Sequence, residues 1–186
     1  VAHFNDYFRD VVKGKTSDFD VQAKGYATGN LFQAHDMPSA LCANTLNKEM
    51  YKIYQQPTQS INYVECHDNA TSWDKMKDCC KDEVREIRVK RQKLMIAVTL
   101  VAQGVPFLQS GQEFCRTKYG YHNTYNAPDN VNQIDWERKN RHNEVVEFTR
   151  DCLRLRKLIR AFRFASTEEI ESHVHFEVTE GQMLLY

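Results

Sequence analysis

Three short apolar runs, each followed by a stretch with helical periodicity, constrain the fold of this 186-residue chain more than any other feature. The runs are 1–4 (VAHF), 61–66 (INYVEC) and 105–109 (VPFLQ). All three resemble strands: 61–66 is rich in β-branched and aromatic residues, whereas 1–4 is too short to judge alone. Strands that alternate with helices are typical of a parallel α/β sheet, because parallel neighbours need long crossover connections.

The three expected helices cover 7–13, about 82–103, and a stretch that ends near 160. Asn5 or Asp6 can cap the first helix, and Gly14 suits its end. Apolar spacing of three, four and seven residues defines the faces expected to contact the core. Those residues are Ile87, Leu94, Val98 and Val101 in the second helix, and Val145, Phe148, Cys152, Leu155 and Ile159 in the third.

Two segments are harder to interpret. Residues 15–60 are interrupted by Gly25, Gly29 and Pro38, which favours a loop with at most a short helix, and 111–142 resembles a long polar loop. Beyond Phe162 the pattern changes. Residues 173–178 and 183–186, with a turn at Glu180-Gly181, predict an antiparallel hairpin.

Three parallel strands alone would leave both sheet edges open. A closed eight-stranded α/β barrel takes about 250 residues. We therefore expect a partial (β/α)8 TIM barrel, comprising about strands 6 to 8 and their helices, in residues 1–161. Residues 162–186 would then begin a C-terminal antiparallel β-sandwich domain.

Charge and hydropathy exclude several classes of partner. Lys plus Arg and Asp plus Glu number 25 each, so no net field favours nucleic acid or an anionic membrane. No apolar run approaches the roughly 20 residues that span a bilayer, and the first residues do not resemble a signal peptide. We expect an uncharged substrate or partner.

The six cysteines lack regular spacing and form no CxxC, and the adjacent Cys79 and Cys80 cannot readily pair. Reduced thiols are therefore expected, which favours the cytoplasm, with a secreted or cell-surface parent protein as the alternative.

His173 and His175 alternate on the expected strand but have no third ligand at a suitable spacing for a metal. Cys66 and His67 point apart on a strand, which argues against a thiolate-imidazole nucleophile.

Polar residues follow the apolar runs at Asn5-Asp6, His67-Asp68-Asn69 and Gln112-Glu113. In α/β barrels the chemistry lies where strands end. The pair His67-Asp68 could hold substrate hydroxyls. Alternatively, Asp68 could cap its own loop by accepting from the backbone amides of Ala70 or Thr71, and the residues alone leave both interpretations open.

Four segments carry a resemblance to a known family. INYVECHDNATSWDKM is similar to the fourth signature region of the α-amylase superfamily in the form found in type I pullulanases. GVPFLQSGQEFCRTKYGYHNTYNAPDNVNQIDW resembles their eighth strand and its loop. FNDYFRDVVKG and AFRFASTEEIESHVHF resemble their sixth strand with its helix and their exit from the barrel. The resemblance covers most of the chain except about 15–55.

The resemblance implies a retaining hydrolase of α-1,6-glucosidic bonds in pullulan, glycogen or branched starch. It makes Asp68 the carboxylate that stabilises the transition state, with His67 and Asn69 binding the same sugar. It also places further residues near the cleft: Glu113, Asn123, Tyr125 and Asp129. Cys66 replaces the commoner Ser before His-Asp, which should alter packing rather than chemistry. No cofactor is implied; calcium occurs in some relatives, but no dedicated ligand cage is evident here.

One departure limits these implications. In the family, the nucleophile and the acid come from strands four and five, which would precede Val1, and no Asp or Glu here matches either. We therefore expect this chain to need the rest of the barrel and to be inactive alone. Two alternatives stay open: a non-catalytic module that binds α-glucan or another partner, and an α-amylase relative with another linkage preference.

Overall fold

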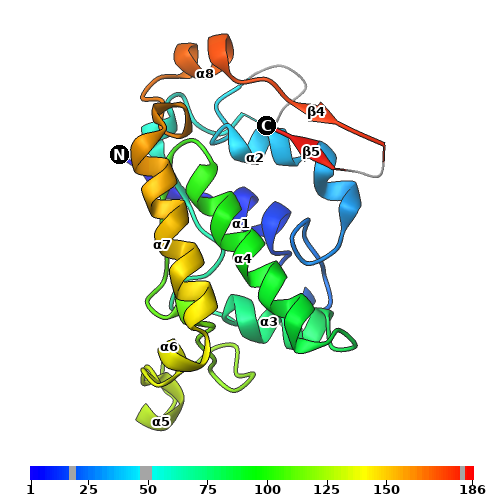
Figure 1. The fold of residues 1–186 in the computed structure, drawn as a ribbon, viewed down its shortest axis with the longest axis vertical. Helices are drawn as coiled ribbons and strands as arrows, with labels where there is room; N and C mark the ends of the chain where they lie inside the picture. Colours follow the sequence, from blue (N-terminus) through cyan, green and yellow to red (C-terminus); the bar gives the residue numbers. More distant parts are fainter. Residues whose placement is uncertain (17–19, 47–51, 181–182) are drawn as a thin grey trace.

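The computed structural model describes residues 1–16, 20–46, 52–180 and 183–186 (Figure 1). The first half of the chain contains β1 (His3–Phe4), α1 (Asp6–Val12), η2 (Leu31–His35), α2 (Met37–Leu41), η3 (Pro57–Gln59), β2 (Ser60–Asn62), α3 (Ser72–Cys79) and α4 (Arg85–Val101). The second half contains β3 (Val105–Pro106), η4 (Gln112–Phe114), α5 (Asp129–Asn132), α6 (Arg138–Arg141), α7 (Asn143–Leu158), η5 (Arg160–Phe162), α8 (Thr167–His173), β4 (Glu177–Val178) and β5 (Leu184–Leu185).

The three expected strands pair in parallel, in the order β1-β2-β3, and this confirms an α/β fold. Both later strands are shorter than predicted. The last sheet-like hydrogen bond runs from the Phe107 N–H to the Asn62 carbonyl at 2.8 Å. Beyond these residues the backbones separate into loops. Tyr63, Glu65, Cys66, Phe107 and Gln109 line a pocket there, whereas Val64 and Leu108 pack into the core.

Asn5 links β1, α1 and the neighbouring strand. Its side-chain oxygen accepts from the Phe8 N–H at 3.0 Å and so caps α1, which confirms the expected helix start. Its Nδ2 donates to Ser60 Oγ at 2.9 Å and to Asn44 Oδ1 at 2.8 Å. All three side chains are fully buried, and their mutual hydrogen bonds offset the cost of removing them from water.

Helices α4 and α7 run side by side (Figure 1). The predicted core face of α4 was wrong in part, because Ile87 and Leu94 are exposed. The buried face carries Val89, Gln92, Ile96 and Thr99 instead. These positions also recur at helical spacing, but two are polar, so a count of apolar residues selects the wrong stripe.

In α7 only the first part of the predicted stripe is buried. Val145 is inaccessible, whereas Leu155 and Ile159 are exposed. At the C-terminal end of α7 the contact with α4 is made by a polar residue. The guanidinium of Arg156 donates to the carbonyls of Leu100, Ala102 and Gly104 at 2.8–2.9 Å. These carbonyls lie where α4 ends, so Arg156 ties the ends of the two helices together.

Several helices lie in stretches expected to be loops. Helix α2 is a single short helix within 15–60, as that segment allowed, and Pro38 does not break it but lies in its first turn, where proline is tolerated. Helix α3 was missed, although Thr71 caps it by accepting from the Asp74 N–H at 3.0 Å. The polar stretch 111–142 contains η4, α5 and α6.

The C-terminal segment forms the expected antiparallel hairpin from β4 and β5. His173 does not join it, because it is the last residue of α8, which Ser166 caps by accepting from the Glu169 N–H. Gly181 of the predicted turn lies outside the described residues. Phe164 and Ile170 pack with Cys42 in a small second core, next to the main one. The domain boundary between 161 and 162 stays a prediction.

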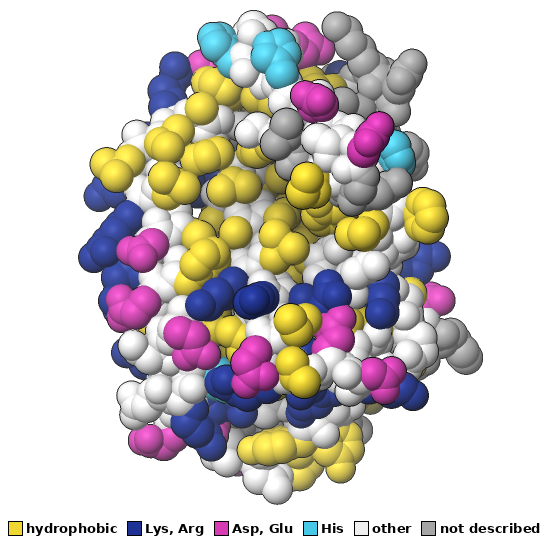
Figure 2. Space-filling model, turned by 45° about the vertical axis from the view of Figure 1, so that its right-hand side comes forward, with side chains coloured by type: hydrophobic (Ala, Val, Ile, Leu, Met, Phe, Trp, Pro, Cys, Tyr) yellow, Lys and Arg dark blue, Asp and Glu magenta, His cyan; other side chains and the backbone are white. Residues whose placement is uncertain are grey.

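The surface has no strongly charged patch of one sign on the face in Figure 2, where Lys and Arg side chains alternate with Asp and Glu. Apolar side chains gather on the upper half of that face.

None of the helices among the described residues combines the length and hydrophobicity needed to cross a bilayer. All six cysteines are free, and four of them are buried.

Candidate active site

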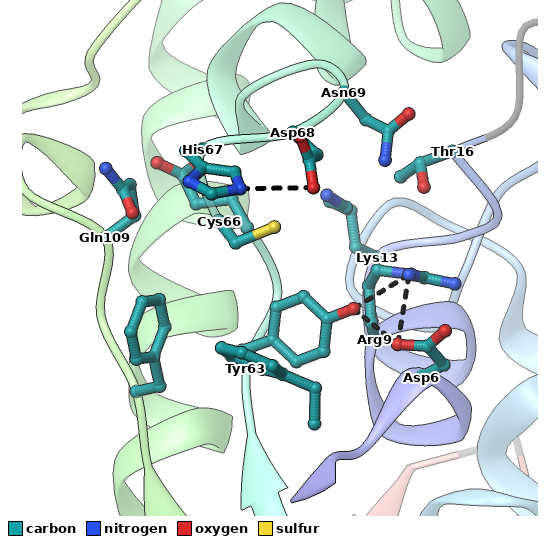
Figure 3. A pocket seen from close by; sticks show the side chains of 13 residues that line it. Asp6, Arg9, Lys13, Thr16, Tyr63, Cys66, His67, Asp68, Asn69 and Gln109 are labelled. Atoms are coloured by element: carbon teal, nitrogen blue, oxygen red, sulfur yellow. Dashed lines mark hydrogen bonds and ion pairs between the residues drawn. The ribbon is translucent and has the colours of Figure 1, made fainter. Parts of the chain in front are cut away.

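A pocket of about 520 Å³ opens at the carboxyl ends of the three parallel strands (Figure 3). Each strand contributes the residues that directly follow it, and this is the position at which α/β folds place ligands. The lining residues are Phe4 at the end of β1 and Asp6, Arg9, Lys13 and Thr16 after it; Tyr63, Glu65, Cys66, His67, Asp68 and Asn69 after β2; and Phe107 and Gln109 after β3.

His67 and Asp68 lie together at the pocket mouth, with His67 Nε2 3.2 Å from Asp68 Oδ2. Both side chains are largely exposed, at 83% and 61%. Asn69 follows in the left-handed backbone region at φ 59°, which Asn tolerates better than most residues, and it also lines the pocket. The three residues thus present an imidazole, a carboxylate and an amide to any polar molecule that enters.

The alternative in which Asp68 caps its own loop is not observed. Among the described residues, no hydrogen bond joins Asp68 to the amides of Ala70 or Thr71. Helix α3 is capped by Thr71 instead, which leaves the Asp68 carboxylate free of backbone donors. Asp68 therefore has unused acceptor capacity toward the pocket.

An aromatic cluster forms the floor of the pocket. The Phe4 ring contacts the rings of Tyr63 and Phe107 edge to face, with centroid distances of 4.8 and 5.3 Å. Tyr63 donates its hydroxyl to Asp6 Oδ1 at 2.5 Å and accepts from Arg9 Nη1 at 2.8 Å. Burial and the bond to Asp6 raise the pKa of Tyr63, which keeps it a neutral donor.

Lys13 and Glu65 lie deeper in the pocket and are almost inaccessible to solvent. Burial lowers the pKa of Lys13 to about 8, although the charge of Glu65 opposes this shift. Burial also raises the pKa of Glu65, against the hydrogen bonds that it receives from Ser72. An amine and a carboxyl group of perturbed acidity therefore lie beneath His67 and Asp68.

The loop that contains Thr117 and Lys118 supports the pocket mouth. Lys118 Nζ donates to the carbonyls of His67 at 3.2 Å and His122 at 3.0 Å. The buried carboxylate of Asp74 in turn accepts from the Lys118 N–H at 2.6 Å and from the Thr117 hydroxyl at 2.5 Å. The backbone of His67 is thus fixed by Lys118, which Asp74 in turn positions.

The other predicted site residues lie apart from this pocket. Glu113 is half-buried in η4 and accepts from the Gly111 N–H at 3.0 Å. Asn123 and Tyr125 are exposed on the loop after η4, and Asp129 is exposed at the start of α5. None of the four lines the pocket, and their roles stay predictions.

Sequence reasoning missed the inner part of the pocket, namely Arg9, Lys13, Tyr63 and Phe107. The order of strands and helices along the chain could have identified these residues. Residues that follow parallel strands share one edge of the sheet, so the first turns of α1 and the ends of the later runs could have been placed opposite His67.

No group of three or more His, Cys, Asp or Glu side chains among the described residues is arranged to hold a metal ion. Each carboxylate that lines the pocket already has a partner in the chain: Asp6 pairs with Tyr63 and Arg9, Glu65 with Ser72, and Asp68 with His67. The arrangement can bind and orient a hydroxyl-rich ligand over an aromatic floor.

Comparison with known proteins extends these observations. No family model matches the chain. A pullulanase of Bacillus subtilis strain 168 is 41% identical over 186 residues, all of this chain and 26% of its own length. The chain belongs to the pullulanase family.

Solved pullulanases share the fold. The structure of type I pullulanase from Bacillus subtilis with maltose superposes with a TM-score of 0.91 and 43% identity, over 95% of this chain and 24% of that one. The pullulanase of Anoxybacillus sp. LM18-11 with maltotriose gives 0.89 and 45%, over 96% and 24%. Pullulanases are glycoside hydrolases. The chain spans about a quarter of the length of the relatives that it matches.

Proposed function

We propose that this chain forms the C-terminal part of the catalytic (β/α)8 barrel of a retaining debranching enzyme that hydrolyses α-1,6-glucosidic bonds in branched α-glucans. The observation that carries the proposal is the exposed His67-Asp68 pair above an aromatic floor, at the strand ends of a pullulanase-like sheet.

In this proposal Asp68 stabilises the transition state. Its carboxylate accepts hydrogen bonds from hydroxyls of the sugar at the cleavage point, and these bonds strengthen as the ring approaches an oxocarbenium ion. His67 and Asn69 bind the same sugar from either side, and the faces of Tyr63 and Phe107 provide apolar surface for its ring. Glu113, Asn123, Tyr125 and Asp129 would contact more distant sugars.

The nucleophile and the acid would come from other strands of the barrel. A retaining glycosidase needs two carboxyl groups about 5–5.5 Å apart that are free to react. Asp6 receives hydrogen bonds from Tyr63 and is paired with Arg9, and Glu65 is buried against Ser72. Neither is free to attack a sugar, which supports a helper role for this chain.

The outer strands support completion by further barrel strands. Strands β1 and β3 form the two edges of the sheet, and each is paired on one side only among the described residues. Phe4 and Val105 on these strands are exposed, at 48% and 41%. Neighbouring strands would cover these side chains and pair the open backbone groups.

Binding of maltotriose, measured by calorimetry, tests the site. His67→Ala and Asp68→Asn should each weaken binding by about tenfold or more, because each loses one charged or polar hydrogen bond. His175→Ala, an exposed histidine distant from the pocket, should leave it unchanged. Equal affinity in all three variants would contradict the assignment.

A reducing-sugar assay on pullulan tests whether the nucleophile and the acid come from other strands of the barrel. The 186-residue chain alone should release no sugar, because it supplies neither the nucleophile nor the acid. Clear release by the purified chain would overturn this part of the proposal. Sequencing upstream of Val1 separates the remaining alternatives: an Asp and a Glu at two preceding strand ends support the enzyme, and their absence supports a binding module.

A further inference from the structure

Two adjacent cysteines at the end of α3 place their sulfur atoms in contact, and neither lines the proposed glucan site. Cys79 Sγ and Cys80 Sγ are 3.7 Å apart. Neighbouring residues within a helix point about 100° apart around its axis. The contact forms because α3 ends at Cys79, and Cys80 has left the helix with φ −129° and ψ 34°.

The surroundings give the two thiols different acidities. Cys80 Sγ lies within reach of both the Thr28 carbonyl, at 3.3 Å, and Cys79 Sγ, and its single S–H can be donated to one of them at a time. Donation to Cys79 lowers the pKa of Cys79 to about 7, and the charges of Lys75 and Lys24 act in the same direction. In contrast, burial raises the pKa of the isolated thiols of Cys42 and Cys115 to about 12. Only a thiolate is a strong ligand for a soft ion.

The spacing of the two sulfurs suits a bidentate thiophilic ligand. A tetrahedral metal with bonds of about 2.3 Å to sulfur would hold two sulfurs roughly 3.8 Å apart. A structural zinc ion needs four ligands, however, and no third His, Cys, Asp or Glu lies within reach among the described residues. Trivalent arsenic is satisfied by two thiolates and one oxygen or carbon group.

We propose that Cys79 and Cys80 form a dithiol site that binds trivalent arsenic as arsenite or an organoarsenical. With arsenite, two As–O bonds break and two As–S bonds form. The two thiol protons leave with the displaced hydroxides as two molecules of water, and one hydroxyl stays on arsenic. Arsenic remains trivalent and neither sulfur is oxidised, so the reaction needs no oxidant or reductant.

The turn after Cys80 gives the ligand a route. Both cysteines are buried, at 6% and 3% exposure, but Lys81 and Asp82 directly behind them are exposed. The turn is short and precedes α4, which begins at Arg85. Local opening of such a turn admits a small neutral molecule without unfolding of the helices.

Phenylarsine oxide is the probe for the test, applied to the folded chain and followed by native mass spectrometry. One adduct per chain should form, protect two of the six thiols from alkylation, and be removed by a small dithiol but not by a monothiol. Cys79→Ser and Cys80→Ser should each weaken binding roughly 100-fold, because the second As–S bond is then no longer intramolecular. Cys152→Ser, which changes a half-buried thiol on α7, should bind as the native chain does.

Peptide mapping of the adduct on the unsubstituted chain keeps the proposal testable if a variant fails to fold. Protection of Cys79 and Cys80 supports it. Protection of any other pair, an adduct retained at full affinity in either serine variant, or an adduct that forms only after denaturation would overturn it.

Discussion

Glu65 and Ser72 are joined by two hydrogen bonds to one carboxylate oxygen. Glu65 Oε2 accepts from the backbone N–H and from the hydroxyl of Ser72, both at 2.5 Å. Ser72 is the first residue of α3, so a negative charge beside the exposed N–H groups of this helix is favourable. The contact fixes the strand end that carries His67 to the start of α3, seven residues along the chain.

Ser72→Ala should destabilise the chain by about 2 kcal/mol at neutral pH, because a buried carboxylate loses one charged hydrogen bond. Both hydrogen bonds from Ser72 lower the pKa of Glu65 against burial, and the loss of the one from the hydroxyl raises it further. The cost should therefore be smaller in acid, where Glu65 is protonated. Urea unfolding at both pH values measures the difference, and Ser172→Ala, on the exposed side of α8, is the control. An equal cost at both pH values would contradict the pairing.

His142 should make stability depend on pH. Burial, followed by the charges of Arg138 and Arg85, lowers the pKa of His142 from 6.5 to about 4. Between these values the unfolded chain binds the proton more tightly, so stability is highest above pH 6.5 and falls as the pH drops toward 4. The loss amounts to as much as about 3 kcal/mol.

His142→Gln should flatten this part of the pH profile, and the exposed His175→Gln should not. Thermal melts across the acidic range measure the slope. A profile for His142→Gln that is as steep as the native one would show that other groups cause the loss.

The start of α1 was predictable from a local signal, and the meeting of the strand ends at one edge was predictable from the alternation of strands and helices. Asn5 caps α1 as its side chain predicted, and parallel strands necessarily bring Asp6 and His67 to one edge. The inward face of α4 was not predictable from apolar residues. Gln92 occupies it because its side chain donates to the Gln112 carbonyl at 2.9 Å, a partner 20 residues away. A polar residue that is buried because of such a distant partner cannot be recognised from the periodicity of apolar residues in the helix.

Helix α3 shows a second limit. Its sequence, SWDKMKDC, has few apolar residues, yet Asp74 and Lys75 in it are fully buried. Lys75 Nζ donates to three backbone carbonyls, those of Lys15, Asp20 and Val21, at 2.6–3.0 Å. A charged residue in a helix normally indicates a solvent face. Here the carbonyls that satisfy it come from a segment more than 50 residues earlier, which the sequence of the helix does not reveal.

Arg156→Lys should separate the C-terminal ends of α4 and α7. A planar guanidinium donates to several carbonyls at once, whereas a single ammonium cannot reach those of Leu100, Ala102 and Gly104 together. We expect a loss of roughly 3 kcal/mol in the free energy of unfolding. Arg154→Lys, two residues earlier, changes an exposed pair with Asp151 and should cost less than about 0.5 kcal/mol. A comparable cost for both variants would show that Arg156 does not act through these carbonyls.

Asp74→Asn should loosen the loop that supports the pocket mouth. The native carboxylate accepts from Thr117 and Lys118, and Asn places two N–H donors in a site that is lined by donors. Hydrogen exchange at residues 116–122 should become faster, with a loss of about 2 kcal/mol in stability. Because Lys118 also donates to the His67 carbonyl, the mobility should extend to residues 66–69. Asp82→Asn, in the exposed turn after α3, should change neither segment. Unaltered exchange around Lys118 in Asp74→Asn would show that the loop is held by its other contacts, among them the pair between His122 and Asp78 at 3.2 Å.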